Sequence, residues 1–127
     1  MQVTLESQDD LLLATAAGNV SVKEVVRVFK NVIDTATEHG FDKILMDFWA
    51  VKGDLSGIDL YEIGKTMAEY CVSKSIYPKV AVVGTPPTVT GLGAQVASNR
   101  GLTSMTFSES QPALNWLRAV GSKAPGS

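Results

Sequence analysis

Hydrophobic and polar positions change their spacing along the chain, and each change predicts a new element. Residues alternate in Val3–Glu6, a polar segment follows at Ser7–Asp10, and the largely apolar run Leu11–Ala17 ends at Gly18. Alternation bounded by polar and glycine residues is typical of strands joined by a turn. The N-terminal region therefore predicts a β-hairpin.

The next segment has the spacing of an amphipathic helix. Apolar residues recur at helical intervals from Val22 to Ala36, Ser21 and Glu24 have the spacing of a capping box, and Gly40 suits a left-handed C-cap. The run Lys43–Trp49 that follows has almost no polar break, which is typical of a strand covered on both faces.

A second helix and a second buried strand follow a loop predicted over Ala50–Gly57. The apolar stripe of this helix consists of Leu60, Ile63, Gly64, Met67, Ala68, Cys71 and Val72. The short β-branched run Lys79–Val83, bounded by Pro78 and Gly84, predicts another interior strand.

The last third predicts a short helix over 91–99, a strand over 103–107 and a final helix. Gly101 is expected to end the short helix, and Ser108 with Gln111 has capping-box spacing ahead of Pro112. The predicted order is β-β-α-β-α-β-α-β-α, an α/β fold on a mixed sheet in one domain over residues 1–120. Residues 121–127 are expected to form a flexible tail.

Composition narrows the classes of function. The 127 residues carry a formal net charge of −2, so no overall positive field favours nucleic acid or anionic lipid. The chain has one cysteine and one histidine, too few for a metal site built from Cys and His ligands and with no choice of histidine for a catalytic triad. We therefore expect no cofactor, no metal and no enzymatic activity. With no signal-peptide pattern and no apolar run of spanning length, we expect a cytoplasmic protein without membrane insertion.

The best local candidate for a site lies where the first buried strand leads into the second helix. Asp54, Ser56 and Gly57 stand at this strand–helix junction, where open α/β sheets place ligands and helix N–H groups favour an anion. Ser56 is a candidate phosphoacceptor. The simpler interpretation, which the residue types favour, is that Asp54 or Ser56 only caps the helix.

A second candidate is the loop Gly84–Gly93, which offers Thr88 and Thr90 and free amides near a helix start. It lacks the lysine and spacing of a phosphate-binding P-loop and the third glycine of a dinucleotide fingerprint. A structural connection between strand and helix is therefore the favoured interpretation.

Three titratable residues have simple structural explanations. Cys71 lies in an apolar stripe and predicts a buried, unreactive thiol, and His39 precedes a helix-ending glycine. Asp47 lies on an apolar strand, where it either faces a crevice or accepts loop amides, and the second role is favoured. An enzyme would have to use Asp47, Asp54, Ser56 or Thr88 without a histidine base.

Aromatic residues surround the second helix, and Trp49 and Tyr61 are the pair of most interest. Such residues can line an apolar ligand pocket, form a protein interface or belong to the core. A ligand-carrying protein would have an apolar cavity under the second helix lined by Trp49, Tyr61 and Met67.

The element order and several short motifs resemble the STAS superfamily, and more narrowly the bacterial SpoIIAA-like (STAS/SEC14-like) proteins. The resemblance covers residues 1 to 120, and its motifs are Ile44–Asp47, Gly53–Ser56, Tyr61–Gly64, Asn99–Gly101 and Ala113–Leu117. It implies a five-strand sheet with four helices. In the anti-sigma-factor antagonists of this superfamily a serine at the start of the second helix is phosphorylated, which the resemblance carries onto Ser56. Those antagonists have Asp-Ser-Ser/Thr-Gly where this chain has Asp54-Leu55-Ser56-Gly57.

Together these observations predict a non-enzymatic regulatory or protein-binding module, and a response to phosphorylation is what the resemblance implies for it. Its working surface is expected over Asp54–Tyr61 with the neighbouring Gly84–Gly93 loop. A protein partner or a homodimer formed through a sheet edge or an exposed aromatic surface is expected. The alternative is a carrier of a small apolar or lipid-like ligand.

Overall fold

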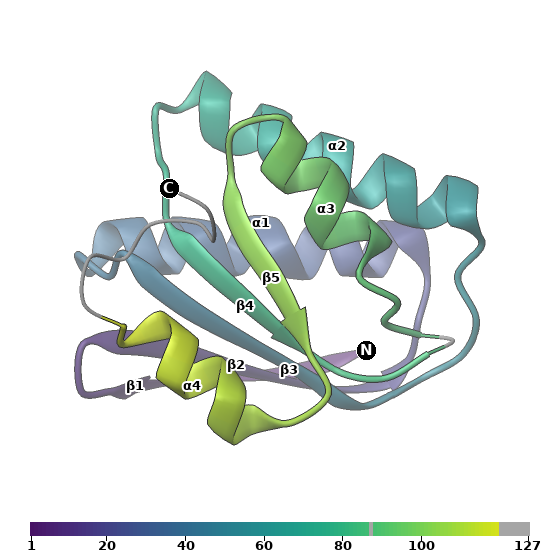
Figure 1. Ribbon diagram of the computed structural model, residues 1–127, viewed down its shortest axis with the longest axis horizontal. Helices are drawn as coiled ribbons and strands as arrows, with labels where there is room; N and C mark the ends of the chain where they lie inside the picture. Colours follow the sequence, from purple (N-terminus) through teal and green to yellow (C-terminus); the bar gives the residue numbers. More distant parts are fainter. Residues whose placement is uncertain (87, 120–127) are drawn as a thin grey trace.

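A computed structural model describes residues 1–86 and 88–119, and the predicted tail at 121–127 lies outside them. The element order is the predicted one, an α/β fold with five strands and four helices. The strands lie side by side in the order β1-β2-β3-β4-β5, with β1 antiparallel to β2 and the other pairs parallel. Helices α1, α2 and α3 lie on one side of the sheet and α4 lies on the other (Figure 1).

The predicted hairpin is confirmed and is longer than expected. Strand β1 spans Gln2–Gln8 and β2 spans Leu11–Asn19. Strand β3 covers Lys43–Lys52, so the prediction of a loop from residue 50 was wrong. The strand continues because its end pairs with the end of β2 beyond a register shift. Strands β4, Lys79–Val83, and β5, Thr103–Phe107, match the predicted segments, with β5 at the sheet edge.

Helix α1, Val22–Glu38, begins at Ser21, whose hydroxyl accepts the Glu24 N–H at 3.2 Å. The Glu24 carboxylate does not complete the predicted box because it pairs with Arg27 at 2.7 Å. Gly40 has φ +78°, as a left-handed helix end requires.

The remaining helices are α2, Gly57–Ser73, α3, Leu92–Asn99, and α4, Ser110–Leu117. The predicted capping box at Ser108 was wrong, because α4 starts after Glu109 and no side chain caps it. The third helical residue is Pro112, which has no N–H to donate to a capping side chain. The stripe of α2 is buried as predicted except for Val72, which is exposed because it lies beyond the margin of that face.

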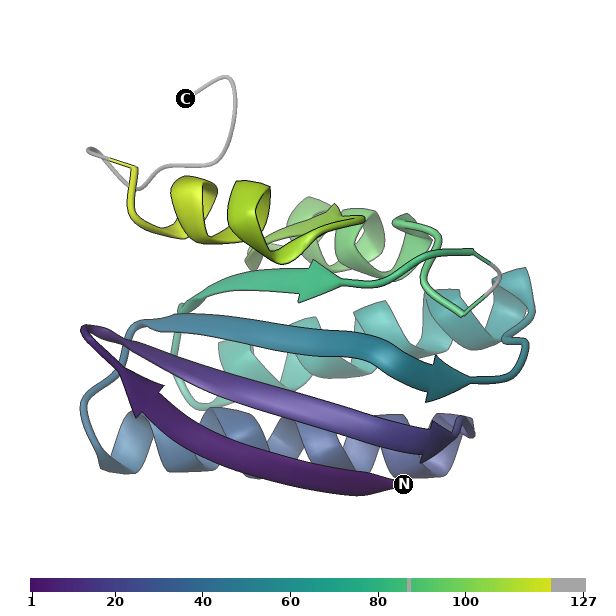
Figure 2. The ribbon, with the colours of Figure 1, turned by 90° about the horizontal axis from the view of Figure 1, so that it is seen from below.

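Two hydrophobic cores form on the two sides of the sheet. Alternate residues of β3 separate them, since Ile44, Met46 and Phe48 enter the core under α1, α2 and α3, whereas Leu45 enters the core under α4. In Figure 2 the strands pass in front of α1 and α2, and β1 is the outermost strand on the side away from α4. The sheet thus carries three helices on one face and one short helix on the other.

Candidate functional site

Ser56 is the N-cap residue of α2. Its hydroxyl accepts the Asp59 N–H at 3.0 Å, and its own N–H donates to the Asp59 carboxylate at 3.1 Å, which completes a capping box. The capping interpretation is confirmed for Ser56. Ser56 and Asp54 are both exposed, so a modifying enzyme can reach the Ser56 hydroxyl. The role of Ser56 as a phosphoacceptor stays a prediction.

The two loops singled out from the sequence lie against each other. The Thr88 hydroxyl donates to the Gly53 carbonyl oxygen at 2.6 Å, which ties the 84–91 loop to the loop before α2. The Thr90 hydroxyl accepts the Leu92 N–H at 3.4 Å at the start of α3. These hydroxyls make the structural connection that the sequence favoured, and Thr88 uses its proton within the chain.

Exposed apolar side chains surround the start of α2. Ile58 is 77% exposed, Tyr61 is 41% exposed and Leu92 of α3 is 39% exposed. Ile58 and Tyr61 are three residues apart and therefore lie on the same side of α2. A Cβ placed on Gly57 would be 3.9 Å from the Leu92 side chain, so α3 brings Leu92 to the same end of α2. We call Ser56, Ile58, Tyr61 and Leu92 the α2–α3 patch.

Arg100, at the end of α3, holds Tyr61 in place. Its guanidinium donates to the Tyr61 hydroxyl oxygen at 2.8 Å and lies 5.7 Å from the centre of the ring. The predicted working surface, Asp54–Tyr61 with the Gly84–Gly93 loop, includes Ile58, Tyr61 and Leu92, but the sequence did not indicate a contact between Arg100 and Tyr61. Leu92 joins the patch, and Arg100 reaches Tyr61, through the packing of α3 on α2, which no local pattern reveals.

Trp49 and Asp47 lie at an irregularity in β3. Thr15 pairs with Asp47 and Ala17 pairs with Ala50, so two residues of β3 face one residue of β2. The Asp47 carboxylate accepts the Trp49 N–H at 3.0 Å. Asp47 thus accepts an amide as favoured, but the amide belongs to the bulge of β3 and not to a loop. The Trp49 side chain is 63% exposed.

A narrow apolar cavity of about 70 Å³ lies under α2, between that helix, α3 and the sheet. Met67 lines it, as predicted, but Trp49 and Tyr61 do not, so that part of the expectation was wrong. Tyr61 points out of the fold toward Arg100, and Trp49 is largely exposed on β3. The lining is mainly apolar, and its aromatic members are Phe29 and Phe48 beside aliphatic residues such as Ile63 and Val80.

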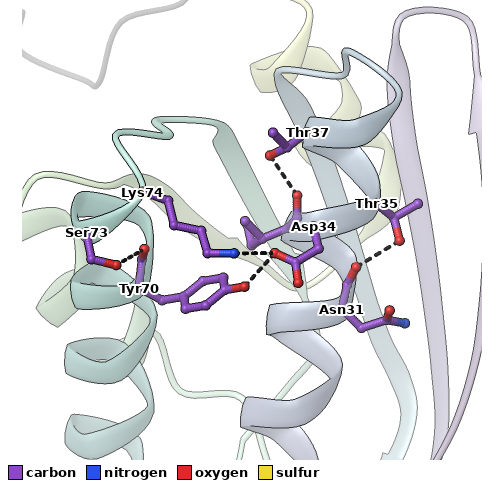
Figure 3. Close-up of polar contacts among 8 residues, drawn as sticks. Asn31, Asp34, Thr35, Thr37, Tyr70, Ser73 and Lys74 are labelled. Carbon is purple, nitrogen blue, oxygen red and sulfur yellow. Dashed lines mark hydrogen bonds and ion pairs between the residues drawn. The ribbon is translucent and has the colours of Figure 1, made fainter.

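At the other end of α2, a polar cluster joins α2 to α1 (Figure 3). The Tyr70 hydroxyl donates to Asp34 at 2.5 Å, and the Lys74 ammonium lies 3.5 Å from the same carboxylate oxygen. The hydrogen bond with Tyr70, followed by the charge of Asp34, raises the pKa of Lys74. The cluster fixes the two helices side by side, so Tyr70 has a structural role.

Cys71 and His39 have the structural roles that the sequence predicted. Cys71 is fully buried, and burial raises the pKa of its thiol to about 11, so it stays protonated and unreactive near neutral pH. His39 caps the end of α1. Among residues 1–86 and 88–119, no three His, Cys, Asp or Glu side chains are grouped as a metal would require. Within the same ranges, no helix is long and apolar enough to cross a membrane.

The sheet order and the helix arrangement are those of a SpoIIAA-like fold, and solved structures support this. An anti-sigma factor antagonist from Mycobacterium paratuberculosis superposes with a TM-score of 0.60 at 13% identity, covering 93% of this chain and 94% of that one. An uncharacterised protein with a SpoIIAA-like fold from Shewanella loihica PV-4 gives 0.53 at 17% identity, covering 91% and 92%. No family model and no curated protein matches the sequence. The STAS/SpoIIAA-like fold predicted from the resemblance is confirmed.

Proposed function

We propose that this chain is a cytoplasmic, non-enzymatic regulatory module that binds another protein through the α2–α3 patch. The observation that carries the proposal is the exposed apolar surface of Ile58, Tyr61 and Leu92 beside an accessible helix-capping serine. Exposed aromatic and aliphatic side chains next to a polar rim favour a protein contact. The anti-sigma factor antagonist that shares the fold is, by its name, a regulator of another protein.

The finer part of the proposal is that phosphorylation of Ser56 switches this surface. A phosphate on Ser56 would lie at the N-terminus of α2, where free N–H groups and the helix dipole favour negative charge. It would also lie beside the Asp59 carboxylate, which now accepts the Ser56 N–H. Repulsion between the two would open the capping box and change the surface next to Ile58.

A native mass spectrum of the protein purified from its own host tests the switch. The wild type is expected to carry one added phosphate, and Ser56→Ala is expected to lose it. Ser21→Ala is the matched control, because Ser21 caps α1 with the same type of hydrogen bond and is also exposed. A phosphate that survives in Ser56→Ala contradicts the assignment.

Partner binding is tested separately by affinity capture from the host followed by titration of the purified partner. Ile58→Glu is expected to weaken the measured affinity about tenfold or more, because it puts a charge in the middle of the apolar surface. Val72→Glu is the control, since Val72 is also exposed on α2 but lies at its opposite end. Equal affinities for Ile58→Glu and wild type would remove the α2–α3 patch from the interface.

The cavity under α2 supports a second candidate, the carrying of a small apolar molecule. Its volume of about 70 Å³ is well below that of ordinary ligand pockets, which measure about 300 Å³ or more. The candidate is therefore restricted to molecules of a few heavy atoms and excludes a lipid chain in this conformation. Xenon, followed by the NMR shifts of the Met67 methyl group, is the probe. Ala97→Val, which fills the cavity, should abolish those shifts, and unperturbed Met67 signals in the wild type would reject the candidate.

A further inference from the structure

The two edges of the sheet differ in how their backbones are protected. At the β5 edge, the Ser98 hydroxyl of α3 accepts the Ser104 N–H at 3.3 Å and donates to the Ser104 carbonyl oxygen at 2.8 Å. One side chain thus occupies both backbone groups that this residue directs away from β4. Covering an edge in this way prevents another strand from pairing with it.

The β1 edge has no such cover in the described part of the chain. Strand β1 is the first in the sheet order, pairs only with β2 and lies outermost in Figure 2. Its seven residues include no proline and one charged side chain, Glu6. Edge strands that avoid pairing commonly carry proline, lysine or a bulge. Strand β1 has none of these over Gln2–Gln8, and its register with β2 is unbroken.

A shallow groove of about 380 Å³ lies beside this edge, on the side of α1. Its apolar lining residues are Leu5, Leu12 and Phe41, and its polar ones are Glu6, Ser7, Thr35 and His39. The groove adjoins the Leu5–Ser7 half of β1, where the inward-facing position after Leu5 is filled only by the small Ser7. A strand added to β1 would place alternate side chains over this groove.

We propose that β1 pairs in antiparallel orientation with β1 of a second copy, about a two-fold axis at Leu5. This register pairs all seven residues of the strand: Gln2 of one copy lies opposite Gln8 of the other, and the two Leu5 residues lie opposite each other at the centre. It puts Val3 of each copy opposite Ser7 of the other, so each valine enters the other copy's groove.

Charge also selects this register. With Leu5 on the axis, Glu6 of one copy lies opposite Thr4 of the other, on the open face of the sheet. Moving the axis to Glu6 would bring the two Glu6 carboxylates face to face, which is unfavourable for directly opposite residues. The sequence of β1 is therefore complementary to itself in the register that pairs the most residues.

The interface does not depend on the proposed function. Strand β1 lies at the far edge of the sheet from β5, which packs against α3. Pairing through β1 therefore leaves the α2–α3 patch of both copies exposed, and each copy can bind a partner. A failure of either proposal leaves the other intact.

Sedimentation equilibrium with a charge-reversal pair tests the proposal. Thr4→Glu puts a carboxylate opposite Glu6 of the second copy twice per dimer and should weaken dimerisation about tenfold, whereas Thr4→Lys should strengthen it. Thr15→Glu is the control, because Thr15 pairs with Thr4 on the same face but lies one strand in from the edge. It should leave the dimer affinity close to that of the wild type.

Hydrogen exchange of the β1 amides gives a second readout on the same samples. Exchange of β1 should slow as the wild-type concentration rises and should remain fast in Thr4→Glu. A wild type that stays monomeric up to sub-millimolar concentration overturns the proposal, and so does a dimer whose affinity is the same in Thr4→Glu and Thr4→Lys. Binding of a foreign extended peptide to a monomeric wild type would assign the edge to another occupant.

Discussion

The two faces of the sheet are covered to very different extents. In residues 1–86 and 88–119, α1, α2 and α3 pack on one face, where twenty buried residues form a single core. On the other face of this described part, only the eight-residue α4 packs on the sheet, over a cluster of six buried residues. The same strands supply both faces. The difference arises because the three helices that connect parallel strands, α1, α2 and α3, all lie on the first face, and only α4, which follows the last strand, lies on the second.

A row of paired residues crossing the sheet shows where the cover of α4 ends. Thr4 pairs with Thr15, Thr15 with Asp47 and Asp47 with Val83. Val83 is buried under α4, whereas Thr4 and Thr15 are exposed. The side chain changes from apolar to polar where the helix stops, because an uncovered sheet face must be compatible with water.

The α4 side also contains a buried lysine. Lys79 is 6% exposed, its ammonium donates to the Trp116 carbonyl oxygen at 2.5 Å, and it lies 4.4 Å from the centre of the Trp116 ring. Burial lowers the pKa of Lys79. The Trp116 carbonyl oxygen also accepts the Ala119 N–H at 3.3 Å, and a cation at the last turn of α4 is favourable for the helix dipole. The smaller core is thus held partly by polar contacts, while the larger one depends on apolar packing.

Adjacent residues of β3 give the strongest test of this comparison. Ile44 and Leu45 are both almost completely buried, but they point into opposite cores. Ile44→Ala is expected to lower the free energy of unfolding by about 4 kcal/mol and Leu45→Ala by about 2 to 3 kcal/mol. The second loss is smaller because the short α4 can move into the space that the leucine side chain leaves. Urea denaturation measures both. A larger loss for Leu45→Ala would contradict the comparison.

The packing of α2 on α3 provides the next test. A Cβ on Gly64 would lie 2.3 Å from the Gly93 carbonyl oxygen and 3.0 Å from the Val96 Cβ, so the helices must separate to admit it. Gly64→Ala should destabilise the protein by about 1 to 3 kcal/mol.

Gly57→Ala is the matched control on the same helix, because the nearest atom to its Cβ would be 3.9 Å away. The substitution should change the free energy of unfolding by less than about 0.5 kcal/mol. If both alanine variants unfold at the same urea concentration, the close approach of α2 and α3 does not limit stability.

On the open face, single substitutions should cost less. Asp47→Ala removes the acceptor of the Trp49 N–H, and water can replace it there, so we expect a loss of about 1 kcal/mol or less. Thr15→Ala, in the same row, should be close to neutral. Thermal unfolding followed by circular dichroism measures both variants. If Asp47→Ala destabilises the protein as much as Ile44→Ala does, this face is more tightly packed than its exposure indicates.

The fold could be predicted from the sequence because its signals are local and agree with one another. The alternation in β1, the helical spacing behind Ser21 and the β-branched run of β4 each specify one element. One error falls where a tertiary contact decides, since β3 continues past residue 50 where β2 pairs with it beyond a bulge. The other is local, because Ser108 and Gln111 have the spacing of a capping box but α4 starts after Glu109 without a side-chain cap.

The candidate site could be predicted only in part. Ser56 carried a local signal, since a serine before an apolar helical stripe is typical of an N-cap. Leu92 fell within the predicted Gly84–Gly93 part of the surface. Its place beside the start of α2 and the bond from Arg100 to Tyr61 could not be predicted, because both depend on the packing of α3 on α2. The prediction that Trp49 lines the cavity was wrong for the same reason. Position on a strand could not show which side chains the helices would enclose.

The smallest expected effect is a pH dependence on the α4 side. Two aspartates of the β1–β2 turn form ion pairs. Asp9 lies 2.9 Å from Arg118, which follows α4, and Asp10 lies 2.7 Å from Lys43 of β3. The hydrogen bond from Lys43 holds the pKa of Asp10 below its ordinary value, so this pair stabilises the fold above the unfolded pKa of about 3.9. The contribution is lost as the pH falls through the lower, folded pKa.

Asp10→Asn should therefore lower the urea midpoint slightly near pH 7 and leave it unchanged at low pH, where the wild-type carboxyl is protonated in both states. Lys43→Gln removes the other partner and should cause a similar loss at neutral pH, with no further loss in the double variant. Both residues are partly or largely exposed, so salt should weaken the difference. A midpoint difference that persists at low pH would mean that Asp10 shapes the turn by its backbone and not through its charge.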